Sequence, residues 1–71
     1  MTNAIETEIR NAAQFMFVDE LGNLWGVGYD EMKYEGNRRN LERLLELGAV
    51  IYDGPGYYHV AEGYESLFNR L

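Results

Sequence analysis

The sequence predicts a small α+β domain in which helices are followed by a β-hairpin and a final helix. Two observations support this fold class: an apolar repeat of helical period near the start of the chain, and two short β runs on either side of a turn-forming segment. A length of 71 residues is sufficient for one domain, spanning 1–71, and not for two. Because the chain has no Cys, the fold must rest on packing alone.

The first segment carries the clearest helical pattern. Apolar side chains recur on one face of a 3.6-residue period from Ile5 to Met16. Asn3, with Glu6 three residues later, is typical of an N-terminal capping box. We therefore expect a helix over residues 4–17. A strand over the end of this segment is the open alternative, and the unbroken period favours the helix.

The middle of the chain predicts short elements separated by breaks. Aromatic and apolar residues alternate with glycines over residues 24–28, which favours a short strand. Asp30 is a suitable N-cap for a short helix over residues 31–35. The Gly-Asn pair at 36–37 is expected to break the chain before a longer helix over residues 38–47.

The longer helix has a buried stripe and a recognisable end. Leu41, Leu44 and Leu45 lie on one face and are expected to point into the core. Gly48 follows the last helical turn and is expected to occupy the C′ position. Ala49 would then contact Leu44 in a Schellman closure.

A β-hairpin and a final helix complete the predicted fold. Strands are expected over residues 49–52 and 57–60, joined by the turn-forming residues 53–56, with Tyr52 opposite Tyr57. The face expected to point into the core carries Ala49, Ile51, Tyr58 and Val60. The outer face would carry Val50, Tyr52, Tyr57 and His59. The final helix is expected over residues 62–70, with a core stripe of Tyr64, Leu67, Phe68 and Leu71.

Two motifs mark the second half of the chain: residues 44–50 read Leu-Leu-Glu-Leu-Gly-Ala-Val, and Glu62-Gly63 follows the predicted hairpin. With these motifs, residues 37–71 resemble the winged helix-turn-helix family of transcription regulators. The family's recognition helix ends in a Leu-x-x-x-Gly-x-Val pattern, which the segment from Leu44 to Val50 matches. A β-hairpin, called the wing, follows in that family, and a Glu-Gly step such as Glu62-Gly63 leads into the last helix. The resemblance implies a small winged-helix-like domain that binds double-stranded DNA, with a homodimer suited to two-fold sites.

The positive charge of the chain is concentrated in the segment that would form the recognition helix. Four of the six basic residues lie between 33 and 43, although the net charge of the whole chain is −6. On a helical wheel Arg39, Asn40 and Arg43 point away from the leucine stripe, where Arg and Asn can contact base edges, and Lys33 and Arg38 would contact phosphates. The expected nucleic-acid-binding residues are Lys33, Arg38, Arg39, Asn40, Arg43, Tyr52 and Tyr57.

The same positions of the arginines are also expected for a solvated helix that is stabilised by ion pairs within it and binds nothing. Arg38 and Glu42, and Arg43 and Glu46, are spaced to form such pairs. The tyrosines of the hairpin would then pack on one another across the strands. The rival functional hypothesis is an acidic protein–protein interaction module, or a phage-like inhibitor, that binds a basic or nucleic-acid-binding partner. Carboxylates surrounding the arginines in the fold would favour this second hypothesis.

Enzymatic function is not expected, and neither is a metal or other cofactor. His59 is the only histidine, Ser66 is the only serine, and no Cys is present. The acidic pair Asp19/Glu20 is interpreted as surface charge and capping, because adjacent side chains diverge. No apolar run is long enough to cross a bilayer and the first residues show no basic leader, so a cytoplasmic protein without a membrane partner is expected.

Overall fold

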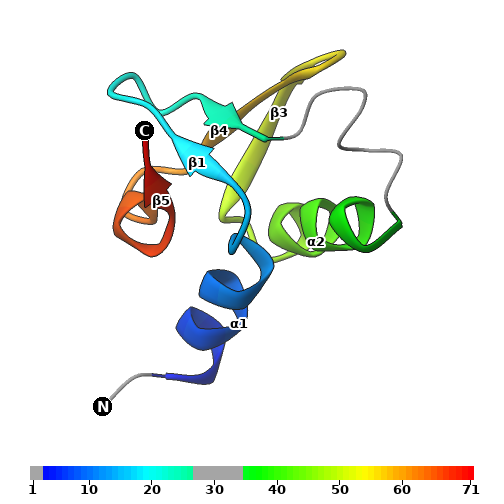
Figure 1. Cartoon of the computed structure of the whole chain (residues 1–71), viewed down its shortest axis with the longest axis vertical. Coiled ribbons are helices and arrows are strands. Elements are labelled where there is room, and N and C mark those ends of the chain that lie inside the picture. The colour runs from blue at the N-terminus through cyan, green and yellow to red at the C-terminus, as the bar shows by residue number, and fades with distance from the viewer. Residues whose placement is uncertain (1–2, 27–34) are drawn as a thin grey trace.

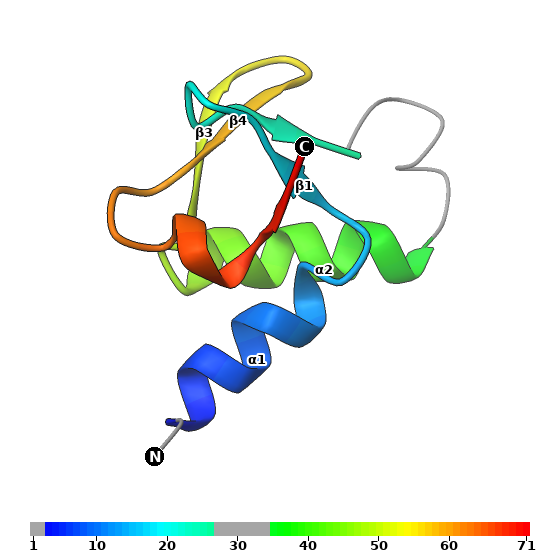
Figure 2. The same cartoon turned by 60° about the vertical axis from the view of Figure 1, so that its left-hand side comes forward.

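The computed structural model describes residues 3–26 and 35–71, which form a small α+β domain (Figure 1). Helices α1 and α2 lie together on one side, and the strands lie on the other side (Figures 1 and 2). One sheet has the strand order β2-β1-β5, and a second sheet pairs β3 with β4. The elements are α1 (Ala4–Ala12), β1 (Phe17–Val18), β2 (Leu24–Trp25), α2 (Glu35–Glu46), β3 (Val50–Gly54), β4 (Tyr57–Val60), the 3-10 helix η2 (Glu65–Leu67) and β5 (Asn69–Arg70).

Helix α1 begins as the sequence predicts and ends earlier. The Asn3 side chain accepts a hydrogen bond from the Glu6 backbone N–H at 2.8 Å, which confirms the N-cap. The preference for helix up to residue 17 is wrong, because Phe17 starts strand β1 and pairs with Trp25 of β2. The strand alternative was the correct one. Pairing on both edges of β1 outweighs the helical period of the preceding residues.

Helix α2 is longer than predicted at its start and ends as predicted. The backbone of residues 36–37 is helical and does not break the chain, so the helix begins at Glu35 instead of residue 38. Gly48 adopts φ +77°, and the Ala49 N–H donates to the Leu44 carbonyl at 3.0 Å. These features confirm the Schellman closure. Most of the predicted short helix at 31–35, the end of the predicted 24–28 strand and Lys33 lie outside the described residues.

The hairpin forms with a register one residue away from the predicted one. Tyr52 lies opposite Tyr58 instead of Tyr57, because a bulge between Tyr52 and Gly54 adds a residue to β3. At the start of β3, the shift moves each side chain to the face opposite the one predicted for it. Val50 is therefore buried opposite Val60, whereas Ile51 is exposed.

The predicted final helix over residues 62–70 is wrong. Gly63 adopts φ +93°, a conformation incompatible with a continuous helix, and only one 3-10 turn follows. The chain then forms β5, which pairs in parallel with β1 so that Asn69 lies opposite Phe17. Phe68 is still buried, as the predicted stripe requires, whereas Leu71 is exposed.

One hydrophobic core joins the two helices to both sheets. Ile9 and Met16 come from the first part of the chain, and Leu41 and Leu44 from α2; all four are almost completely buried. The two sheets adjoin where the Val60 N–H donates to the Gly22 carbonyl at 2.8 Å. This core fixes α2 with its leucines inward and leaves its opposite face for solvent or a partner.

Candidate functional site

The outward face of α2 carries the expected basic residues that the structure describes. Arg38 and Arg39 are exposed, Asn40 is partly buried, and Leu41 on the inward face is buried. The predicted leucine seam is therefore confirmed. Each of the two exposed arginines takes part in at least one polar or electrostatic interaction within the chain.

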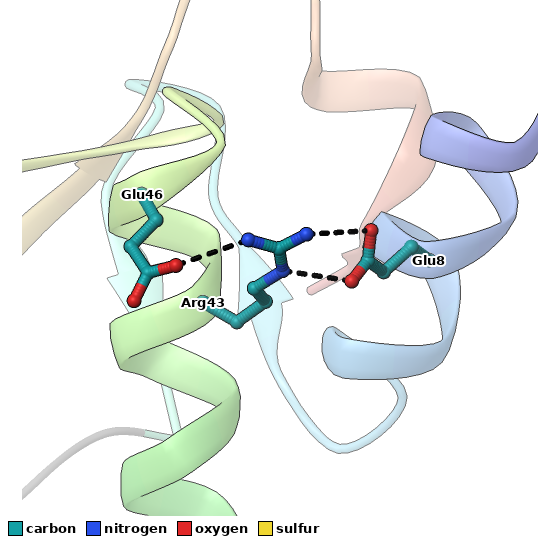
Figure 3. A network of polar contacts seen from close by, with 3 residues as sticks. All are labelled: Glu8, Arg43 and Glu46. Atoms are coloured by element: carbon teal, nitrogen blue, oxygen red, sulfur yellow. Dashed lines mark hydrogen bonds and ion pairs between the residues drawn. The ribbon is translucent and has the colours of Figure 1, made fainter.

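Arg43 is exposed, and its guanidinium is paired with two carboxylates (Figure 3). Its Nε lies 2.7 Å from Glu8 Oε1, and its Nη2 lies 3.2 Å from Glu8 Oε2. The Nη1 atom is 3.0 Å from Glu46 Oε2. All three guanidinium nitrogens thus donate to carboxylates. The two bonds to Glu8 have the bidentate geometry that arginine favours with a carboxylate. The contact joins α1 to α2 at the surface.

The charges of this network explain the shifted pKa values. The hydrogen bonds from Arg43 hold the pKa of the Glu8 carboxyl below its usual value. The hydrogen bond to Glu8, followed by the one to Glu46, raises the pKa of the Arg43 guanidinium. Both partners therefore stay charged, and the three side chains together carry one net negative charge. Glu46 was expected from its i,i+3 spacing, whereas Glu8, on another helix, had no local sequence signal.

The two tyrosines expected to bind DNA lie on the hairpin. Tyr52 is 55% exposed and Tyr57 is 72% exposed. The Tyr52 ring packs on Tyr58 with centroids 5.6 Å apart and planes tilted by 58°, so its cross-strand partner is Tyr58 and not the expected Tyr57. The tip of the hairpin lies at the end of β3 far from α2 in both views (Figures 1 and 2). The tip of the hairpin and α2 are therefore separate parts of the molecule.

A second surface, which sequence reasoning did not single out, gathers acidic side chains around a hollow of about 430 Å³. We call it the acidic hollow. It is lined by Asp19, Glu20, Leu21, Gly22, His59, Val60, Glu62, Glu65 and Arg70. Four carboxylates and one guanidinium give this lining a net charge of −3, half of the net −6 of the chain. Two of the carboxylates are the pair Asp19/Glu20 of the β1–β2 turn, and the other two come from the segment after β4, about forty residues away, so the sequence does not show that they share one surface.

Asp19 organises the turn at one wall of the acidic hollow. Its carboxylate accepts hydrogen bonds from the backbone N–H groups of Leu21 and Asn23, both at 2.9 Å, and from the Trp25 indole at 2.9 Å. The indole bond, followed by the backbone bonds of the turn, holds the pKa of Asp19 below its usual value. Asp19 is therefore a permanent negative charge at neutral pH, and the interpretation of this residue as a capping and surface charge agrees with its contacts.

The part of the chain that the structure describes offers no evident metal centre. Within residues 3–26 and 35–71, no three His, Cys, Asp or Glu side chains are grouped so that they could hold a metal ion. His59 instead contacts Asp53 across the hairpin through Nδ1. None of the described helices combines the length and the apolar character needed to cross a membrane.

Comparison with known proteins gives no relative for this chain. No protein-family model matches the sequence, and neither a curated protein nor a solved structure shows significant similarity.

Proposed function

We propose that this chain is a small acidic interaction module that binds a basic protein partner, such as a nucleic-acid-binding protein. The observation that carries the proposal is the pairing of Arg43 with Glu8 and Glu46, which neutralises the arginine nearest to the middle of the expected recognition helix. The negative charge of the acidic hollow, in contrast, remains largely uncompensated. A positively charged partner fits that distribution.

The formal charge of α2 does not favour DNA binding. The α2 segment contains three arginines and three glutamates, so its formal charge is zero, and Glu8 adds a further negative charge beside it. Non-specific DNA affinity depends on cations that neutralise phosphates and release counterions. A helix of zero formal charge, in a chain of net charge −6, therefore contributes little to non-specific DNA affinity.

Two fluorescence-anisotropy titrations test the proposal. Labelled oligolysine and a labelled random-sequence DNA duplex are each titrated with the protein at low and at physiological salt. We expect saturable binding of oligolysine that weakens with salt, and no binding of the duplex. Binding of the duplex without binding of oligolysine, or binding of neither, contradicts the proposal.

A second candidate, a winged-helix DNA-binding regulator, is favoured by one observation. Arg38 and Arg39 are exposed on the first half of α2, and the helical period places Arg39 opposite the buried leucines, where a recognition helix contacts bases. In this candidate Asn40 assists base contacts, and Tyr52 and Tyr57 flank the DNA. The double variant R38A/R39A should then abolish duplex binding without unfolding the domain, as followed by circular dichroism.

A further inference from the structure

An apolar surface adjoins the acidic hollow. Leu21 is 86% exposed and Leu71 is 73% exposed. Together with Asp19 and Glu20 they line one shallow hollow, which shares three of its four residues with the acidic hollow. Exposed apolar side chains scattered singly are normal, but these two leucines line the same concavity and so form a shared apolar contact area. We call the combined area the leucine–acid surface.

The charges around the leucines determine which occupant fits. Neither Glu20 nor Glu62 has an ion-pair or hydrogen-bond partner for its side chain within the described residues, and Asp19 is ionised at neutral pH. Arg70 is the only Lys or Arg among the residues lining the hollow. A second copy of this chain would bring the same negative charge against it, and a nucleic acid would bring phosphates. A cationic occupant is the one that charge complementarity favours.

We propose that the leucine–acid surface binds a basic, amphipathic peptide segment of the partner. In this arrangement an apolar side chain of the segment contacts Leu21 and Leu71. Lys or Arg side chains on either side of it reach Glu20 and Glu62. The proposal deepens the proposed function and rests on it, because it names the surface and the chemistry through which the basic partner is held.

Two peptide probes separate the apolar contact from the charge contact. One is an acetylated, amidated peptide of repeating Lys-Lys-Leu, and the other repeats Lys-Lys-Ala at equal length and charge. We expect the Leu peptide to bind the wild-type protein about tenfold more tightly by isothermal titration calorimetry, because its larger side chains bury more apolar area. The variant Leu21→Ser should bring the two affinities close together, since it removes the apolar contact.

A matched pair of charge variants locates the site. E20Q/E62Q and E6Q/E42Q each remove two exposed carboxylates, but only the first pair lies on the leucine–acid surface. We expect E20Q/E62Q to weaken binding of the Leu peptide at least about fivefold and E6Q/E42Q less than about twofold. Amide NMR shifts in the wild-type complex should concentrate at residues 19–22 and 62–71.

The outcomes distinguish failure of the surface from failure of the function. If neither peptide binds the wild-type protein, both the proposed function and this surface assignment are refuted. If the peptides bind, yet E20Q/E62Q loses no more affinity than E6Q/E42Q or Leu21→Ser keeps the preference for Leu, the partner is basic but is held elsewhere. Retained amide dispersion in each variant shows that loss of binding is not loss of fold.

Discussion

Replacement of Asn69 tests the part of the fold that differs most from the sequence prediction. The Asn69 Nδ2 group donates to the carbonyls of Gln14 at 2.8 Å, Met16 at 3.1 Å and, more weakly, Ala13 at 3.4 Å. One side chain thus ties the residues that follow α1 to strand β5. If residues 62–70 were helical, a change at this position would have little effect.

Asn69→Ala removes two well-formed hydrogen bonds, each contributing roughly 0.5–1.5 kcal/mol net. The bond to Gln14 is exposed, so water can replace it, whereas the bond to Met16 is partly buried; we expect a loss of about 1–2 kcal/mol in the free energy of unfolding. Asn69→Asp should cost about 2–3 kcal/mol, since it also aims a carboxylate at carbonyl oxygens.

Thermal unfolding followed by circular dichroism measures this effect. For a domain of this size, 1 kcal/mol corresponds to about 4–8 °C in Tm. Asn11→Ala is the control, because Asn11 is exposed and its side chain has no hydrogen bond within the described residues. Equal Tm values for Asn69→Asp, Asn11→Ala and the wild type would refute the role given to Asn69 and the β1–β5 pairing with it.

Two further predictions concern the β1–β2 turn and its surroundings. Gly26→Ala should destabilise by roughly 2–4 kcal/mol in urea unfolding, because residue 26 has φ +91° and a Cβ would lie 2.9 Å from the Phe15 carbonyl oxygen. Gly63→Ala, with φ +93° and open space, should cost only about 1–2 kcal/mol, and equal costs would contradict the close approach. Since the folded state lowers the pKa of Asp19 below 3.8, its stabilising contribution is present above that pH and is lost as the pH falls through and below it. Asp19→Asn should therefore have a lower Tm than wild type at neutral pH and approach it in acid, and parallel Tm–pH curves would contradict this.

Local signals predicted the elements whose stability is local. The end of α2 follows from a leucine, a glycine able to take a positive φ and a small residue, all within six positions. In the structure the Ala49 N–H donates to the Leu44 carbonyl and the Gly48 N–H donates to the Leu45 carbonyl at 3.1 Å. The capping of α1 by Asn3 is equally local. Such contacts form between residues close in the sequence, so the local sequence pattern is sufficient to predict them.

The wrong predictions share a dependence on distant partners. Strand β1 is stabilised between β2 and β5, and β5 lies about fifty residues away in the sequence. The periods that favoured helix over residues 4–17 and 62–70 did place Met16 and Phe68 in the core. Periodicity indicates which side chains are buried, but it does not report which backbone groups find a partner strand. The Glu8–Arg43 contact was missed for the same reason.

The Glu8–Arg43 pair also provides a test between the two functional candidates. If α2 binds DNA through Arg43, the guanidinium must exchange Glu8 and Glu46 for phosphate or base oxygens, so the pair competes with DNA. Glu8→Gln weakens that competition. Glu6→Gln on the same helix changes the net charge equally, yet the Glu6 side chain has no ion pair within the described residues.

The DNA-binding candidate therefore predicts a difference between these two variants. E8Q should bind a random-sequence duplex severalfold more tightly than E6Q at low salt, with a salt dependence steeper by about one phosphate contact. The acidic-module proposal predicts no duplex binding by either variant and equal binding of oligolysine by both. Net charge alone cannot produce a difference between E8Q and E6Q, because it is the same in both. A difference would show that the carboxylate beside Arg43 opposes DNA binding, whereas equal behaviour would exclude Arg43 from a DNA-contacting face.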